Sequence, residues 1–439
     1  RVAAAGLKAT GAKTGVLTGG RLTVEDAAAY AAFARGVLGT SDIDFRARAV
    51  SDEETAFLAS EVAGRSLELT YADLEVAPAV LLVGFEPEDE SPIVFLRLRK
   101  AARTNGTKVY AIAPYATAGL GKVSGTLIAT APHAEPHAVA QSAELLSAAG
   151  SVILVGERAA STPGLLTAVA KVAKATGARI GWIPRRAGER GALDAGLLPI
   201  GGRNTEDIIS ATGDEVTGLV IAGVQASDLM ADLEGAIERA DFVVSLETRH
   251  TEVTALADVV LPVAAVTEKA GTFRNWEGRD RSFTAVAPKQ GILSDAEVLG
   301  ELATALGGDL TITSDFWTTA SKPELSGAPV GAPVLEAGQA ELSSWRHLLD
   351  NGSLQEGEPY LAATARVPVI RVSPATAKQL GLTDGVAATV ECASVTASAQ
   401  VIITDEMVDG VVWLPANSAD CSLNLPSGLV VNVTAGGNA

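Results

Sequence analysis

Eight short apolar runs within the first 261 residues constrain the fold of this chain more than any other feature. Each run is three to five residues long and nearly continuous in its hydrophobicity, without strict alternation. That pattern is typical of strands that are buried on both faces of a parallel sheet. The predicted strands are 14–17, 80–83, 108–112, 152–155, 179–183, 219–221, 242–246 and 259–261.

Amphipathic stretches of helical period lie between these runs, at 24–38, 93–105, 165–176 and 229–240. Strands that alternate with helices predict doubly wound α/β layers. The ends of the helices carry suitable residues. Thr23 is a candidate N-cap with Asp26 three residues later, Thr162 precedes Pro163, and Gly177 follows the third helix.

The composition changes after residue 307. Residues 311–359 are rich in Pro, Gly, Ser and Glu without clear alternation, which indicates an extended segment. Short β-prone runs then surround a helix at 374–380 that Ser373 can cap, and this predicts a small β-barrel. The predicted domains are a discontinuous first α/β domain (1–48 and 216–310), an inserted Rossmann-like domain (49–215), a linker (311–362) and the barrel (363–439).

Charge and hydropathy exclude two classes of partner. The chain has 52 acidic and 34 basic residues and a formal net charge of −18, and we expect no Lys/Arg cluster to offset it, so nucleic-acid binding is not expected. No apolar run approaches the ~18 residues of a membrane-spanning helix, so direct membrane insertion is not expected either. Because the chain begins at Arg1, we expect a fragment or a processed product of a soluble intracellular protein.

The cysteines and histidines do not form a convincing metal site. An iron–sulfur cluster normally needs four thiolates, so Cys392 and Cys421 cannot hold one alone; two reduced thiols are favoured over a disulfide. His133 and His137 have metal-binding spacing, but Pro136 argues against a helix there, so loop histidines are favoured. His250 follows a predicted strand and has no clear partner, which favours a structural role.

Nucleotide and hydrolase motifs are absent from the sequence. Gly119 and Gly121 belong to no phosphate-binding loop, and no G-x-S-x-G elbow occurs. The predicted strand 80–83 is followed by an acidic group, Glu86, Glu88, Asp89 and Glu90. These carboxylates would repel a pyrophosphate at the carboxyl end of the sheet, and the alternative is a solvated acidic loop.

Three sets of residues carry a resemblance to a known family. Residues 258–262 (DVVLP), 268–273 (EKAGTF), Asn275 and 277–279 (EGR) are similar to a signature of the molybdopterin oxidoreductases. Residues 84–87 with 91–92 resemble a loop of that family's Rossmann-like domain. Residues 371–385 resemble its molybdopterin-dinucleotide-binding barrel. The resemblance implies an α/β fold with two doubly wound Rossmann-like domains and a small C-terminal β-barrel.

The departures from that family concern its cofactor. Ile43, Asp44 and Arg48 match the stretch that leads to the molybdenum ligand, but the ligand position falls on Val50, with Ser51 out of register. Phe85 or Glu86 stands where the family has Asn in a phosphate loop, and Ala113 and Tyr115 replace its ribose-binding acid and its Arg. We therefore expect no catalytic, cofactor-binding or metal-binding residues in this segment.

Residues 92–103 and 411–418 resemble the large iron–sulfur subunit (the G subunit) of respiratory complex I, in its actinobacterial forms. This resemblance implies a structural, non-catalytic segment of NADH-quinone oxidoreductase, a translocating enzyme that carries electrons from NADH to quinone. It also implies [2Fe-2S] and [4Fe-4S] clusters in a missing N-terminal part, other peripheral-arm subunits as partners, and a peripheral position on the cytoplasmic side of the plasma membrane. The 411–415 face and the 311–359 segment are candidate packing surfaces.

Two alternatives stay open. The first is a molybdopterin-dependent oxidoreductase of the formate dehydrogenase or nitrate reductase type, which would need Ser51 as the metal ligand. The second is a degenerate Rossmann module that binds a small nucleotide.

Overall fold

The computed structural model describes residues 1–439 except 230, 314–315, 394, 419–420, 422–423 and 437–439. The chain forms two compact units. Unit 1 comprises Arg1–Leu67 and Arg186–Glu324, and unit 2 comprises Glu68–Arg185 and Leu325–Ala439. Among the described residues, no helix has the length and apolarity that a membrane span requires.

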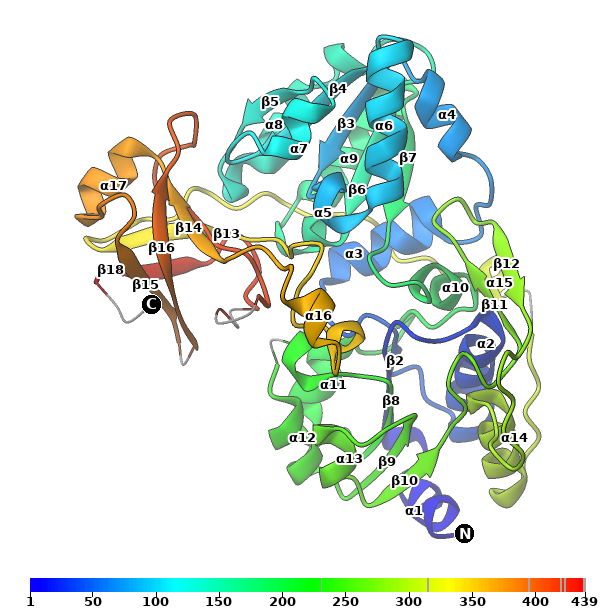
Figure 1. Cartoon of the computed structure of the whole chain (residues 1–439). Helices are drawn as coiled ribbons and strands as arrows, with labels where there is room; N and C mark the ends of the chain where they lie inside the picture. The colour runs from blue at the N-terminus through cyan, green and yellow to red at the C-terminus, as the bar shows by residue number, and fades with distance from the viewer. Residues whose placement is uncertain (230, 314–315, 394, 419–420, 422–423, 437–439) are drawn as a thin grey trace. The chain divides into compact units, whose positions relative to one another are not determined.

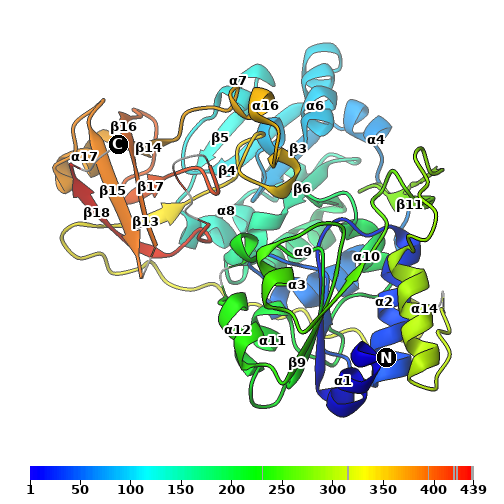
Figure 2. The ribbon, with the colours of Figure 1, turned by 60° about the horizontal axis from the view of Figure 1, so that its bottom comes forward.

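Unit 1 is built on a five-stranded parallel sheet in the order β10-β9-β8-β1-β2, with helices on both faces (Figure 2). Its strands are β1 (Thr14–Thr18), β2 (Ile43–Asp44), β8 (Gly218–Ala222), β9 (Phe242–Glu247), β10 (Val259–Pro262) and the hairpin β11 (Gly271–Arg274) and β12 (Asp280–Phe283). Its α-helices are α1 (Val2–Thr10), α2 (Val24–Ala32), α3 (Asp52–Phe57), α10 (Glu189–Asp194), α11 (Thr205–Ala211), α12 (Leu233–Arg239), α13 (Glu252–Leu256), α14 (Asp295–Ala305) and α15 (Phe316–Thr319). Apolar side chains of β1, β8 and β9 pack against α11 and α12 to form the core on one face.

The α/β part of unit 2 has a second parallel sheet, in the order β5-β4-β3-β6-β7 (Figure 1). Its strands are β3 (Ala79–Val83), β4 (Lys108–Ala113), β5 (Thr126–Ala129), β6 (Val152–Gly156) and β7 (Arg179–Ile183). Its α-helices are α4 (Tyr71–Val76), α5 (Pro87–Glu90), α6 (Pro92–Thr104), α7 (Ala118–Lys122), α8 (Glu135–Gln141) and α9 (Leu165–Thr176). The chain runs outward from β3 through β4 to β5 and then returns to β6, so the direction of winding reverses between β3 and β6.

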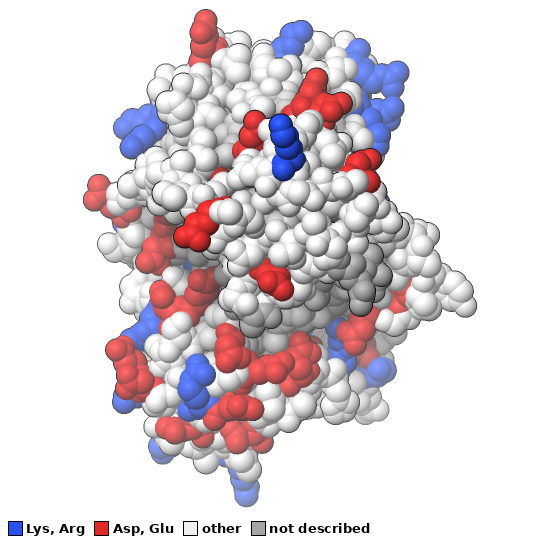
Figure 3. Space-filling view, turned by 90° about the vertical axis from the view of Figure 1, so that its left-hand side faces the viewer, with Lys and Arg blue, Asp and Glu red and all other residues white. Residues whose placement is uncertain are grey.

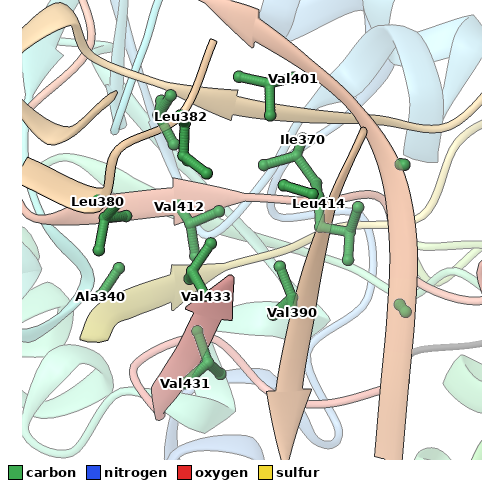
Figure 4. Close-up of a cluster of buried hydrophobic side chains, with 14 of the residues drawn as sticks. Ala340, Ile370, Leu380, Leu382, Val390, Val401, Val412, Leu414, Val431 and Val433 are labelled. Carbon is green, nitrogen blue, oxygen red and sulfur yellow. The ribbon is translucent and has the colours of Figure 1, made fainter. Parts of the chain in front are cut away.

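The C-terminal part of unit 2 is a closed barrel in the order β13-β17-β14-β16-β15-β18. Its elements are β13 (Gln339–Ser343), α16 (Pro359–Ala362), β14 (Val369–Val372), α17 (Pro374–Leu380), β15 (Ala387–Cys392), β16 (Val395–Ile403), β17 (Val411–Trp413) and β18 (Val430–Ala435). Inward-facing residues such as Ile370, Val390, Val412 and Val433 fill the barrel (Figure 4). Alternate residues of each strand point inward, which explains why short β-prone runs sufficed to predict this part.

Most predicted elements are confirmed. All eight predicted strands are present, and the helix predicted at 165–176 has those ends. Thr23 caps α2 by accepting a hydrogen bond from the Asp26 N–H, and Ser373 caps α17 in the same way. The Thr162 prediction is wrong, because Gly164 in the left-handed conformation is the N-cap of α9 and Pro163 lies outside the helix. Helix α12 starts later than predicted, at Leu233, because the Asp232 side chain caps it.

The domain boundaries differ from the prediction in two places. Strand β13 lies within the predicted linker, where it pairs with β17 and β18 and helps to close the barrel. Residues 49–67 and 186–215, which were assigned to the inserted domain, belong to unit 1. For residues 49–67 the physical reason is buried charge, because Arg46 and Arg48, before that boundary, bind Glu54 after it.

Candidate functional site

The carboxyl ends of β3 and β6 are where a doubly wound sheet would hold a cofactor. In unit 2 the two loops at this place pack directly against each other. A Cβ atom built on Gly84 (φ +55) would lie 2.6 Å from the Ala159 backbone nitrogen, and one on Gly156 would lie 2.4 Å from the Gly84 carbonyl oxygen. The backbones of the two loops are therefore in close contact at these glycines, and neither position has room for a side chain.

The acidic group after β3 is mostly removed from water. Glu86 and Asp89 are buried, and Glu88 and Glu90 are half-buried. Glu86 accepts a hydrogen bond from the Thr117 hydroxyl at 2.7 Å, and a carboxylate oxygen of Glu90 lies 2.5 Å from the Glu86 backbone nitrogen. The prediction of a solvated acidic loop is wrong, because α5 turns these side chains into the protein.

Burial raises the pKa of these carboxyl groups toward neutrality. It raises the pKa of Glu86 to about 7 and that of Glu90 to about 8. Glu135, at the start of α8, is also buried, and desolvation raises its pKa to about 7. Desolvation therefore favours the neutral form of these carboxyl groups near pH 7.

Arg158, in the loop after β6, is a cation that favours the ionised form of these carboxyl groups. Its positive charge opposes the rise in the pKa of Glu86, Glu90 and Glu135. Its guanidinium carbon lies 4.9 Å from the centre of the Trp345 ring. The sequence analysis missed Arg158, although its position directly after a buried parallel strand was a usable signal.

An aromatic cluster fills the space next to this loop. Tyr115 stacks on Trp345 with 5.5 Å between ring centres and meets Trp413 edge-on at 5.5 Å. Met407 and Val411 complete the cluster. Tyr115 therefore replaces a polar nucleotide contact with apolar packing against the barrel, and desolvation raises the pKa of its hydroxyl. The 411–415 strand, predicted as a packing surface, packs in this way within unit 2.

His133 and His137 point to different partners. The Glu341 carboxylate accepts the His133 backbone N–H at 2.8 Å and lies 2.6 Å from its Nδ1, whereas His137 Nε2 meets the Gln141 amide at 2.8 Å. The loop prediction is wrong for His137, because α8 begins at Glu135 and Pro136 fits its first turn. Within the described ranges, no group of three His, Cys, Asp or Glu residues is arranged to hold a metal ion.

In unit 1, the position expected for a metal ligand lies beside a buried ion-pair network. Arg46 is fully buried and binds Asp44 through two nitrogens, at 2.9 and 2.8 Å, and Glu54 at 3.1 Å. Arg48 also binds Glu54, at 2.6 Å. Val50 is half-buried and aliphatic. The Ser51 hydroxyl caps α3 by accepting the Glu54 N–H at 3.2 Å.

The family-like segment 268–273 has a structural role in unit 1. Lys269 binds both Asp26 of α2 and Asp295 of α14, at 2.5 and 3.1 Å. Asp295 also accepts two hydrogen bonds from Arg21, at 2.9 and 2.8 Å. Burial alone would raise the pKa of Asp295, but Arg21 and Lys269 hold it below the usual range. Lys269 of this motif therefore connects α2 with α14, and Asp295 connects both to the loop after β1 through Arg21.

The remaining candidates are simple to place. His250 lies in an exposed loop. Gly119 and Gly121 lie in α7, whose Lys122 pairs with Glu88. Cys392 and Cys421 are thiols, and Cys421 is buried. Glu277 is buried within the 275–279 turn, where it accepts a hydrogen bond from the Asn275 amide at 2.7 Å.

The residues at the positions that the resemblance assigns to a molybdopterin cofactor do not have the chemistry of its contacts. In unit 2, buried carboxyl groups lie in the expected phosphate loop. In unit 1, an aliphatic side chain stands at the metal position and the adjacent hydroxyl is engaged as a cap. In the part of unit 1 that the structure describes, these side chains hold helices and loops in place.

Comparison with known proteins shows the family to which the chain belongs. Residues 3–305 match the family model "Molybdopterin oxidoreductase", and residues 342–438 match "Molydopterin dinucleotide binding domain". The fold also resembles acetylene hydratase from Pelobacter acetylenicus, with a TM-score of 0.57 at 14% identity over 95% of this chain and 81% of that one. The chain belongs to the molybdopterin oxidoreductase family, and the predicted fold class is confirmed.

Within that family, the chain is similar to the G subunits of NADH-quinone oxidoreductases. It is 48% identical to the G subunit of Mycobacterium bovis, over 99% of this chain and 61% of the relative. It is 45% identical to the G subunit of Streptomyces coelicolor, over 98% of this chain and 60% of the relative. The predicted resemblance to the actinobacterial G subunits is confirmed. The chain thus spans about three fifths of the length of these relatives.

Proposed function

We propose that this chain is a structural, cofactor-free part of a large subunit of NADH-quinone oxidoreductase. The observation that carries the proposal is that residues which the resemblance assigns to cofactor contacts have structural roles: Ser51 caps α3 and Tyr115 packs in an aromatic cluster. Its similarity to the G subunits of such enzymes supports the same function. In this role the segment supports electron transfer from NADH to quinone without itself carrying electrons.

The proposal includes the setting of the whole protein. The iron–sulfur clusters would lie in the part of the relatives that this chain does not span. Its partners would be other peripheral-arm subunits, on the cytoplasmic side of the plasma membrane. The translocating enzyme is then the assembly, and this segment is a non-catalytic part of it.

Metal analysis of the intact subunit tests this proposal. The subunit is purified from its host within the complex, and its molybdenum and iron are measured per mole of protein by plasma mass spectrometry. We expect iron at cluster stoichiometry and molybdenum well below one atom per chain, because Val50 offers no ligand. One molybdenum atom per chain would overturn the proposal.

The alternative is a molybdopterin-dependent enzyme. One observation favours it: the chain is 26% identical to "F420-dependent formate dehydrogenase subunit alpha" of Methanocaldococcus jannaschii, over 52% of this chain and 42% of that protein. It would require Ser51 to leave its cap on α3 and bind the metal. A Ser51→Ala variant that keeps full activity in the assembled complex, together with its normal metal content, would rule this alternative out.

A further inference from the structure

Helix α6 (Pro92–Thr104) carries a basic sequence feature that neither the fold nor the proposed function uses. Four basic residues occur within seven positions, and the helix has no acid: Arg97, Arg99, Lys100 and Arg103. The prediction that no Lys/Arg cluster offsets the acidic charge is therefore wrong. Figure 3 shows Asp and Glu spread over one face of this chain of net charge −18, so a basic helix surface is a local exception.

Packing of α6 against the rest of unit 2 accounts only for the apolar residues on its buried face. Val94, Phe95, Leu98 and Ala101 are buried against unit 2. The opposite face has Ile93, Leu96, Lys100 and Arg103 at intervals of three and four residues, which places them in one stripe along the helix. Ile93 and Leu96 are each 52% exposed, so the stripe is apolar toward the helix start and basic toward its end.

Helix α4 neutralises Lys100, which is part of this stripe, and the neighbouring Arg97. Glu75 of α4 binds Arg97 and Lys100, the latter at 2.7 Å. Across the described part of the chain, neither Arg99 nor Arg103 is within ion-pair distance of a carboxylate, and both are exposed. Cations near a helix C-terminus interact favourably with the helix dipole, which accounts for Arg103 but not for Ile93, Leu96 or Arg99.

We propose that the α6 stripe (Ile93, Leu96, Lys100 and Arg103, flanked by Arg99) docks an acidic protein surface of another subunit in the same assembly. The proposal rests on the proposed function, which supplies the assembly. Apolar residues beside unpaired cations fit a partner face that has an apolar spot bordered by Asp or Glu. Charge complementarity of this kind speeds association and sets orientation, and salt weakens it.

A charge-reversal experiment tests the docking surface. The full-length subunit carries an affinity tag in its native host, and the complex is extracted from membranes and captured at several salt concentrations. The variant is Arg99→Glu/Arg103→Glu, and the matched control is Lys171→Glu/Lys174→Glu, which makes the same change of charge on exposed positions of α9. Melting temperature checks that both variants fold.

We expect the α6 variant to recover about tenfold less of the partner subunits than wild type, with the loss greatest at low salt and smaller at high salt, where the charges are screened, and the α9 control to match wild type. Ile93→Ser/Leu96→Ser should also reduce recovery, but with the salt dependence of wild type. Equal recovery by the α6 variant and the control would overturn the docking surface and leave the proposed function standing. A wild-type subunit that captures no complex would overturn both.

A lipid surface is the other partner that a basic and apolar stripe could bind. Binding of the isolated chain to vesicles of anionic phospholipid distinguishes it from a protein partner. If wild type binds such vesicles and Arg99→Glu/Arg103→Glu does not, the stripe faces lipid and the protein-docking proposal is overturned. We expect no binding by either chain, because the carboxylates elsewhere on the acidic chain repel the anionic surface.

Discussion

At the scale of single residues, Arg46 is the clearest case of a charge whose removal should lower the free energy of unfolding strongly. It is fully buried and is the shared partner of Asp44 and Glu54. Arg46→Met should destabilise unit 1 by about 3–5 kcal/mol, because both carboxylates lose a buried partner. Arg65→Met, at an exposed pair with Glu61, should change stability by less than about 1 kcal/mol. Thermal unfolding of the two variants measures the difference, and equal melting temperatures would contradict it.

The buried carboxyls of unit 2 make stability depend on pH. An unfolded Glu ionises at pKa ~4.3, whereas burial raises the folded pKa of Glu90 to about 8 and those of Glu86 and Glu135 to about 7. The folded state therefore holds protons that the unfolded state has released, and stability falls as pH rises from about 5 through 8. The nearby charges, Arg158 and Glu157, act in opposite directions on Glu90.

Glu90→Gln should flatten this dependence, because the amide cannot ionise. We expect the variant to match wild type near pH 5 and to exceed it by a few kcal/mol at pH 9, as measured by denaturant unfolding at several pH values. Glu144→Gln, at an exposed position, should follow the wild-type curve. If Glu90→Gln lost as much stability as wild type between pH 5 and pH 9, the neutral buried carboxyl would be excluded.

Single-residue chemistry was predictable only where local sequence decides it. The aliphatic side chain of Val50 and the cap by Thr23 follow from neighbouring residues. The burial of Glu86 does not, since it depends on how α5 turns and on Thr117, which lies 31 residues away in sequence. Lys269 and Asp26 are even further apart in sequence, so no local sequence pattern could predict their ion pair.

At the scale of elements, the contact between the loops after β3 and β6 depends on glycine. Gly84 has φ +55, and a Cβ there would also collide with the Ala159 backbone. Gly84→Ala should destabilise unit 2 by about 2–4 kcal/mol, from left-handed strain and displaced loops together. Gly106→Ala has similar strain (φ +70) but open space, so about 1 kcal/mol is expected. Similar losses in denaturant unfolding would show that the loop contact contributes nothing.

Elements with a strong local pattern were predicted and those without one were not. Strands β3 and β6 are uniformly apolar, and both were found. Strand β2 has two residues, and β13 combines Glu341 with its apolar residues in a region rich in Pro and Gly, so neither has a recognisable period. Their strand character comes from pairing with β1 and with β17 and β18.

At the scale of the whole molecule, the sequence predicted the kinds of layers but not how the chain divides. The two compact units join segments that are far apart in sequence, and unit 2 combines an α/β sheet with the barrel. That combination depends on contacts between side chains of both parts: Tyr115 follows β4 of the sheet, and Trp345 and Trp413 belong to the barrel. Local composition predicts a linker at 311–362. It cannot reveal β13, because the strands that pair with β13 lie about 70 or more residues further along the chain.

The aromatic cluster predicts that unit 2 unfolds as one body. Trp413 is 2% exposed, lies 4.8 Å from the Trp345 ring and contacts Tyr115, which follows β4. Trp413→Ala should cost about 3–5 kcal/mol and should speed amide hydrogen exchange in both the barrel and β4 (Lys108–Ala113). Val401→Ala removes packing only inside the barrel, so its effect should stay in the barrel strands. If Trp413→Ala left exchange in β4 unchanged, the barrel and the sheet would be independently stable, and the buried aromatic cluster would serve only the barrel.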